Sequence, residues 1–394
     1  MQEMSVLITH ARVRSALVAT QSLGRRGIKV TPADSIYPAT SFFSKYSSSY
    51  FIYPPYKLYP EQFIKYLKRF IERKNIKVLM PIYEETFVIS KYREKFSNGV
   101  NMVVADYETL KKANNNYYLV NFADEIGVKT PQTWKIERLE DLRRVAKEVK
   151  YPAVIKLVEG VGSKGLRFAR SEDELIAKYI EVIKKFHLKP FEYPIIQEYI
   201  PGDSYGVSLI FNCGEPRAIC IYKNIRTYPI YGGPSTARIS IKHDKMRRNA
   251  IILLRELNYH GVAEVEFRID ERTKEPVLME INPRFWGSLN QAICAGVDFP
   301  YLLYKIATEG DVHPVLTYNA GVKTRWMLGD LRALIDYIRT ERGKEILKDF
   351  FKFHGQYYDD ISLDDPLPSI IEFLTPIMNF IRSGKPKFSP EEER

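Results

Sequence analysis

The first hundred residues alternate short apolar runs with a stretch of helical periodicity. Ser5 to Thr9, Ile28 to Pro32 and Val78 to Ile82 are runs rich in β-branched residues, which predict buried strands. Between the last two, apolar residues in Pro60 to Asn75 recur with the spacing of one helix face. Strands that alternate with helices are typical of a parallel sheet with crossover helices, so the pattern predicts an α/β domain over residues 1–110.

The pattern changes in the rest of the chain. Tyr151 to Leu157 is strand-like and a helical stretch follows from Ser171 to Phe186. The runs Val262 to Asp270 and Pro276 to Ile281 are separated by a gap typical of a β-hairpin. The order of elements therefore predicts an α+β region after the α/β domain.

Composition narrows the class of protein. Among 394 residues, 45% are hydrophobic and 27% are charged, which is typical of globular proteins. No window reaches the roughly 18 consecutive apolar residues of a membrane span. The three cysteines match neither a disulfide framework nor a CxxC metal pattern, so we expect a reducing, cytoplasmic location. The net charge of +11 favours an anionic ligand such as a nucleotide, but the basic residues are dispersed and no nucleic-acid partner is expected.

A lysine and a glycine-rich loop form the first candidate motif. Lys156 ends the strand-like run, and the loop that follows contains Gly160, Gly162, Ser163 and Gly165. Glycines allow backbone N–H groups to approach a polyphosphate, and a lysine neutralises its charge. The spacing is not that of a Walker A loop, and a tight hairpin with a solvated lysine is the alternative interpretation.

Carboxylates on the predicted hairpin form the second motif. Glu264 and Glu266 share one face of their strand, and Glu280 and Asn282 follow on the neighbouring strand. Pairing of these strands brings Glu266, Glu280 and the Asn282 carbonyl within reach of one ion. Such oxygen ligands, together with water and phosphate, are those that hold Mg²⁺. A solvated polar face of a sheet is the alternative, but Glu280 lies between apolar residues, where an unpaired carboxylate is costly.

A third segment completes a recognisable order of motifs. Gln197, Glu198, Tyr199 and Ile200 end an apolar run just before a turn at Asp203. The order of lysine strand, glycine-rich loop, this Q-E-Y-I segment and E…E-x-N-x-R resembles the ATP-grasp superfamily of ATP-dependent ligases. The resemblance is to carboxylate–amine ligases and to carbamoyl-phosphate-synthase-like ATP-grasp domains, and it covers about residues 5–330.

The resemblance implies a domain organisation. An N-terminal parallel α/β domain of the pre-ATP-grasp type, residues 1–110, would precede a two-lobed ATP-grasp fold at 111–320. Within that fold, 111–150 and 241–320 would enclose a central lid subdomain at 151–240. Residues 321–394 would form a C-terminal helical extension.

The resemblance also implies a role for each matching residue. Lys156 would contact the ATP phosphates, and the lid over them would contain Gly160, Gly162, Ser163 and Gly165. Gln197, Glu198, Tyr199 and Ile200 would line the adenine hinge, with Asp203 near the ribose. Glu266, Glu280 and Asn282 would hold Mg²⁺ or Mn²⁺, and Arg284 would face the transferred phosphoryl group. One departure stands out: Asn116 occupies the place where many members of the superfamily have a second ATP-contacting lysine.

Two further segments are candidates for the second substrate. Arg226 could grip a substrate carboxylate and Lys223 could reach the triphosphate, or their segment is a surface hairpin loop. His10 and Arg12 follow the first strand, at the edge where open α/β sheets bind ligands.

These observations predict an ADP-forming ligase with small-molecule substrates. A carboxylate would be phosphorylated by Mg-ATP to an acyl phosphate and its acyl group transferred to an amine, as the resemblance implies. Activation of bicarbonate, as in carbamoyl phosphate synthase or biotin carboxylase, is one alternative, and a non-catalytic nucleotide-binding scaffold is another. The apolar segment 368–382 is expected to dock on the core or in a homodimer interface, and peripheral membrane contact is the less favoured alternative.

Overall fold

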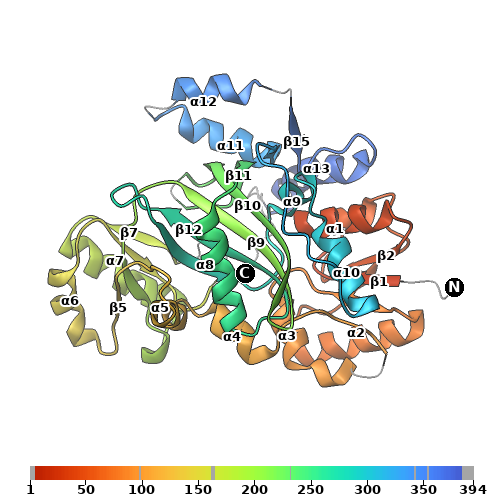
Figure 1. Cartoon of the computed structure of the whole chain (residues 1–394), viewed down its shortest axis with the longest axis horizontal. Coiled ribbons are helices and arrows are strands. Elements are labelled where there is room, and N and C mark those ends of the chain that lie inside the picture. The colour runs from red at the N-terminus through yellow and green to blue at the C-terminus, as the bar shows by residue number, and fades with distance from the viewer. Residues whose placement is uncertain are drawn as a thin grey trace.

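Three sheets organise the chain in the computed structural model, which describes residues 5–96, 99–160, 165–230, 232–340, 343–352 and 355–383. Figure 1 shows the N-terminal sheet with its helices at one end of the molecule, the small sheet at the other end and the large sheet between them. The predicted mixture of an α/β domain and an α+β region is confirmed.

The N-terminal sheet is parallel, as the alternating pattern predicted. Its order is β3 (Phe51–Ile52), β2 (Lys29–Asp34), β1 (Ser5–Ile8) and β4 (Val78–Met80). Helices α1 (Arg14–Gly24) and α2 (Pro60–Lys74) pack on it. The apolar face of α2 is fully used, since Phe63, Ile64, Leu67, Phe70 and Ile71 are all buried. Each such side chain contributes about 1.5–3 kcal/mol relative to exposure.

The small sheet is antiparallel and carries Lys156. Its order is β5 (Thr133–Lys135), β8 (Ile195–Glu198), β6 (Ala153–Lys156) and β7 (Arg167–Ala169). Helices α6 (Leu142–Glu148) and α7 (Glu172–Phe186) cover one face and enclose a core of their own. The side chain of Ser171 caps α7 by accepting a hydrogen bond from the N–H of Glu174.

The large sheet takes its strands from a long part of the chain. Its order is β13 (Pro276–Asn282), β12 (Gly261–Ile269), β9 (Ser204–Asn212), β10 (Glu215–Thr227), β11 (Ser235–Ser240), β14 (Lys323–Arg325) and β15 (Gln356–Tyr358). Helix α8 (Asp244–Glu256) packs against β9 and β10. The remaining helical elements are η1 (Thr40–Phe43), α3 (Glu85–Lys91), η2 (Arg93–Phe96), α4 (Tyr107–Asn114), α5 (Asn116–Glu125), η3 (Leu139–Asp141), η4 (Pro190–Glu192), α9 (Leu289–Cys294), α10 (Phe299–Glu309), α11 (Met327–Tyr337), α12 (Gly343–Phe350) and α13 (Pro366–Ser383).

Two predicted boundaries differ from this topology. The central subdomain was expected at 151–240, but strands β9, β10 and β11 leave the small sheet and join the large one. In the large sheet β9 buries both of its apolar faces: Val207, Leu209 and Phe211 enter one core and Ile210 the other. The segment 321–394 is also more than helical, because β14 and β15 extend the large sheet. Among the described helices, none is long and apolar enough to cross a membrane.

Candidate active site

The β12–β13 hairpin brings the predicted carboxylates together. Glu266 pairs directly with Glu280, and Glu264 pairs with Asn282, so the predicted hairpin and its pairing are confirmed. The amide Nδ2 of Asn282 donates hydrogen bonds to Glu266 Oε1 at 2.8 Å and to Glu264 Oε2 at 3.3 Å. Asn282 therefore holds two of the three carboxylates in fixed positions.

Lys156 reaches this cluster from the small sheet. Its Nζ lies 2.6 Å from Glu280 Oε2 and donates to the Met279 carbonyl at 3.1 Å. Its side chain is 15% exposed, and that of Glu280 is 34% exposed, so the pair faces a region that a ligand can enter. The ion pair therefore joins the small sheet to the large one at the cluster.

The cluster holds more negative charge than its lysine balances. Removal from water, together with the charges of Glu280 and Glu264, raises the pKa of Glu266 well above its usual value. Burial raises the pKa of Glu264 to about 7. Burial acts on Glu280 in the same direction, but the charge and hydrogen bond of Lys156 outweigh it and leave the pKa of Glu280 lowered. A further cation would relieve this crowding.

Arg284 connects the cluster to the N-terminal domain. Its guanidinium donates to Asn282 Oδ1 at 3.0 Å and to the Phe285 carbonyl at 2.7 Å. The same guanidinium lies 4.7 Å from the centre of the Tyr83 ring, which follows β4. Arg284 is thus held between the predicted metal ligands and the edge of the N-terminal sheet.

Sequence reasoning missed a support beneath the carboxylates. The Tyr222 hydroxyl donates to Glu264 Oε1 and accepts a hydrogen bond from Ser288 Oγ at 2.7 Å. Gly206 pairs with both Glu266 and Tyr222, so the three share one row and one face of the sheet. The tyrosine ring occupies the space that a side chain at position 206 would need. An isolated Gly inside an apolar strand pattern was the available signal, since it marks a close approach.

The loop after Lys156 lies partly outside the described residues. Gly162 and Ser163 fall there, so their predicted contacts with phosphate stay predictions. Gly165 is described and has φ +74°, a conformation that L side chains rarely adopt, and a Cβ there would lie 2.7 Å from Leu157. Gly160 lies in the same loop and is the last described residue before residues 161–164.

The predicted hinge residues lie on and just after β8. Gln197 is 2% exposed and donates to Thr133 Oγ1 at 3.0 Å, and Ile200 is 3% exposed. Glu198 forms a 2.7 Å ion pair with Arg272, and Tyr199 stacks edge-on against Phe168. Because Gln197 and Ile200 are buried, only their backbone groups could meet a ligand.

Three other residues, Arg226, Lys223 and Asp203, were expected to contact a substrate or ATP. Arg226 was expected to grip a substrate carboxylate, but its side chain is 1% exposed and is paired with Asp330 and Asp349, which makes it a structural residue. Lys223 forms an ion pair with Asp203, and its register with Tyr205 places it on the opposite face of the sheet from Glu266. Its contact with the triphosphate therefore stays a prediction, as does that of Asp203 with the ribose.

Asn116 connects the start of α5 to the segment after Lys156 by hydrogen bonds. Its backbone N–H donates to the Val158 carbonyl at 2.8 Å and its Nδ2 donates to the Leu157 carbonyl at 3.0 Å. It is 7% exposed, so it ties the start of α5 to the chain just beyond Lys156. A lysine at this position would lack the amide that donates to the Leu157 carbonyl.

The donor set fits a magnesium ion held in part by its substrate. Within the described ranges, no group of three or more His, Cys, Asp or Glu residues is arranged to hold a metal by itself. Glu266, Glu280 and the Asn282 oxygen supply only hard ligands, and Mg²⁺ commonly completes such a set with water and substrate phosphates. The close approach of these carboxylates, which raises the pKa of Glu266, agrees with a site for a cation.

Comparisons with known proteins agree with this geometry. Residues 113–288 match the model of the family described as an ATP-grasp domain. The carbamoyl phosphate synthase large chain of Thermotoga neapolitana is 24% identical over 196 residues, which are 47% of this chain and 18% of that protein. The aligned region thus spans under a fifth of that relative.

Solved structures show the same fold across most of the chain. A biotin carboxylase from Campylobacter jejuni, in a complex with an ATP compound, superposes with a TM-score of 0.66 at 17% identity, covering 81% of this chain and 74% of that one. An L-amino acid ligase from Bacillus licheniformis gives a TM-score of 0.62 at 16% identity, covering 80% and 78%. The resemblance inferred from the motifs is therefore confirmed for residues 113–288, which match an ATP-grasp domain.

Proposed function

We propose that this protein is an ADP-forming ligase that joins a small-molecule carboxylate to an amine. The single observation that carries the proposal is the cluster of Glu266, Glu280, Asn282 and Arg284 against Lys156. A hard-ligand metal site beside a strand lysine suits Mg-ATP. These five residues include no Ser, Thr or Cys, which suits a reaction in which the substrate carboxylate itself attacks the γ-phosphate.

The residues then act mainly by position and charge. Lys156 would neutralise the phosphates, while Glu266, Glu280 and Asn282 would hold Mg²⁺. The ion would stabilise the charge that develops on the transferred phosphoryl oxygens. Arg284, fixed by Asn282 and Tyr83, would orient the acyl phosphate. The loop that contains Gly160 and Gly165 would exclude water, which otherwise hydrolyses an acyl phosphate.

Activation of bicarbonate is the second candidate. It is favoured by the relatives named carbamoyl phosphate synthase and biotin carboxylase. ADP release that depends on bicarbonate and not on an organic carboxylate would support this candidate over the first.

Calorimetry of ATP binding to the full chain tests the nucleotide site. We expect binding that strengthens with Mg²⁺, and a loss of at least about tenfold in that Mg²⁺ effect in Glu280→Gln, because one hard ligand is gone. The matched control is Glu275→Gln, which lies on the same hairpin in an exposed ion pair with Lys245. An unchanged Mg²⁺ effect in Glu280→Gln would contradict the metal assignment. ADP release in a carboxylate-plus-amine screen then tests the reaction.

A further inference from the structure

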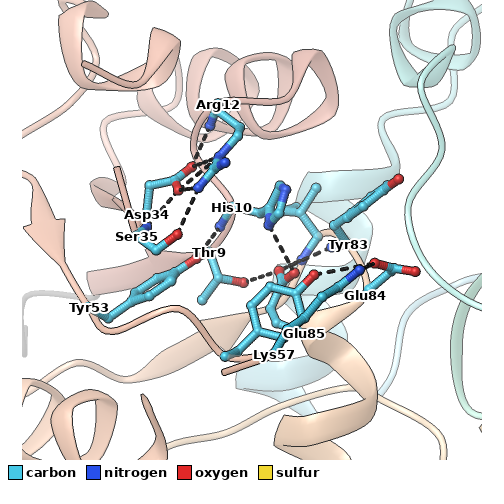
Figure 2. A network of polar contacts seen from close by, with 12 residues as sticks. Thr9, His10, Arg12, Asp34, Ser35, Tyr53, Lys57, Tyr83, Glu84 and Glu85 are labelled. Carbon is cyan, nitrogen blue, oxygen red and sulfur yellow. Dashed lines mark hydrogen bonds and ion pairs between the residues drawn. The ribbon is translucent and has the colours of Figure 1, made fainter. Parts of the chain in front are cut away.

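A second group of polar side chains gathers at the carboxyl edge of the N-terminal sheet. Figure 2 shows that it draws on segments that follow three strands: Thr9, His10 and Arg12 after β1, Ser35 after β2, and Tyr83, Glu84 and Glu85 after β4. Ligands bind at this edge in open α/β sheets.

At its centre lies a buried histidine–carboxylate pair. His10 Nδ1 is 3.3 Å from Glu85 Oε2, and the two side chains are 8% and 0% exposed. The other oxygen of Glu85 accepts hydrogen bonds from Thr9 Oγ1 at 2.5 Å and from the N–H groups of Ile82 and Tyr83, both at 3.1 Å. Glu85 is therefore fixed, and it holds the imidazole through Nδ1.

The backbone and rings around His10 hold its orientation. His10 has φ +58°, which is uncommon for a residue with a side chain, and its N–H donates to the Tyr53 hydroxyl at 3.0 Å. Its ring lies 4.8 Å from the Tyr83 ring and 6.1 Å from the Tyr56 ring, centre to centre. Since Nδ1 faces Glu85, Nε2 is the ring nitrogen that this contact does not engage.

This pair is continuous with the ATP-grasp cluster. Tyr83 contacts His10 on one side and the Arg284 guanidinium on another, and Arg284 contacts Asn282. The other charged groups at this edge are matched in pairs. Arg12 Nη2 lies 2.5 Å from Asp34 Oδ1, and Lys57 Nζ lies 2.5 Å from Glu84 Oε2. His10 is thus linked to Arg284 through the Tyr83 ring, which contacts both side chains.

We propose that His10, oriented by Glu85, binds the amine substrate and takes its proton before the amine attacks. This inference rests on the proposed function and names the acceptor class, a primary amine that arrives as its ammonium ion. Neutral His10 would carry its proton on Nδ1, donated to Glu85, and would accept through Nε2. A ring of tyrosines next to a carboxylate also suits a cationic group.

The step balances as follows. One proton passes from the ammonium nitrogen to His10 Nε2. The freed lone pair attacks the acyl carbon, the C–N bond forms, and the C–O bond to phosphate breaks with its electron pair on the phosphate. The second proton lost from nitrogen leaves on the phosphate, and His10 returns its proton to water.

Histidine-resolved NMR of the full chain with Mg-ADP tests amine binding without the natural substrate. The probe is glycinamide, a small primary amine, and its matched control is N-acetylglycinamide, which has no amine. The His10 Nε2 signal is identified by its loss in His10→Gln, or by its shift in Glu85→Gln if the first variant does not fold. We expect glycinamide alone to move this signal, while that of exposed His313 stays in place.

Several outcomes separate the inference from the proposed function. If the His10 signal does not shift with glycinamide, or shifts equally with both probes, the inference is overturned even if ATP binds. Absence of ATP binding overturns the proposed function whatever His10 does. In amine-dependent ADP release, we expect His10→Gln to lower kcat about 100-fold with the KM for ATP unchanged. Hydroxylamine is unprotonated at neutral pH, so with this amine His10→Gln should release ADP as fast as the wild type does. A loss of kcat with hydroxylamine as large as that with a protonated amine would contradict proton transfer by His10.

Discussion

Glu85 and Glu266 are both carboxylates removed from water, but their pKa values move in opposite directions because their neighbours differ. Burial would raise the pKa of Glu85, yet the charge and hydrogen bond of His10, with the Thr9 hydroxyl and the Tyr83 N–H, lower it to about 2. Glu266 has Glu280 and Glu264 beside it, and its pKa is raised. The charge of the first carboxylate is thus stabilised by its neighbours, whereas the charge of the second is disfavoured by the carboxylates beside it.

Glu85 is expected to make stability depend on acid pH. Its folded pKa of about 2 is below the usual 4.5, so its contribution is present above pH 4.5 and is lost as the pH falls toward 2. The shift corresponds to about 3 kcal/mol. Urea unfolding across this range should therefore show a steeper loss in the wild type than in Glu85→Gln. The control is Glu61→Gln, at an exposed position of α2, which should follow the wild type.

Single residues could be predicted where chemistry and spacing agree. Glu266, Glu280 and Asn282 follow from strand alternation, since a hairpin of that length places them opposite one another. Arg226 could not be placed in the same way, because its partners Asp330 and Asp349 are more than a hundred residues away. Glu85 had a signal in the sequence: after the strand-like run at Val78 to Ile82 and one tyrosine, two acidic residues follow in succession.

At the scale of elements, strand β9 determines how the carboxylate face is built. Gly206 on β9 lies between Glu266 on β12 and Tyr222 on β10, and it leaves room for the tyrosine ring. A Cβ at this position would lie 2.4 Å from the Tyr222 hydroxyl and ring. The ring cannot retreat easily, because Glu264 and Ser288 hold its hydroxyl from buried positions.

Gly206→Ala should therefore destabilise the protein through this ring. We expect a loss of about 1–3 kcal/mol in the free energy of unfolding, the usual result of overpacking a buried site. The matched control is Gly99→Ala, because a Cβ there meets nothing within 4 Å and its φ needs no glycine. Denaturant unfolding of both variants measures the difference. Equal stability of the two variants would show that Tyr222 can move aside.

The elements also show where sequence patterns stop being informative. The apolar periods of α2 and α7 and the β12–β13 hairpin were predictable, because each depends on residues close in the chain. The assignment of β9 to the large sheet was not, since an apolar strand carries no mark of which sheet it joins. The place of β14 in that sheet also depends on a strand far away in the chain, β11, and β15 joins the sheet only by pairing with β14.

At the scale of the whole molecule, the C-terminal segment fastens the N-terminal domain to the large sheet. Asp359, next to β15, lies 3.4 Å from Arg14 on α1 and is also paired with Arg238 on β11. A few residues later the segment reaches α1 and η1, where Asp364 and Asp365 bind. Figure 1 shows α13 beside this N-terminal region, although the two are far apart in sequence.

Asp364 and Asp365 offer a matched pair for measuring this attachment. Asp365 is 1% exposed and accepts hydrogen bonds from Gln21 Nε2 at 2.9 Å, Ser44 Oγ at 2.5 Å and the Lys45 N–H at 2.9 Å. Asp364 forms an ion pair with Arg25 at 3.0 Å in which both side chains are more than two-fifths exposed. These two adjacent aspartates thus differ in burial, although both attach the C-terminal segment to residues in or next to α1.

Replacing each aspartate by asparagine should show how much the buried and the exposed contact each contribute to the free energy of unfolding. Asp365→Asn puts an N–H₂ donor where one carboxylate oxygen accepted, so a buried donor loses its partner, and we expect a loss of about 2–3 kcal/mol in unfolding free energy. Asp364→Asn should cost less than about 1 kcal/mol, because water replaces an exposed ion pair. Urea unfolding gives both values, and limited proteolysis should cut the C-terminal segment faster only in Asp365→Asn. Faster cutting in neither variant would mean that other contacts, such as those of Asp359 and Asp360, hold the segment in place.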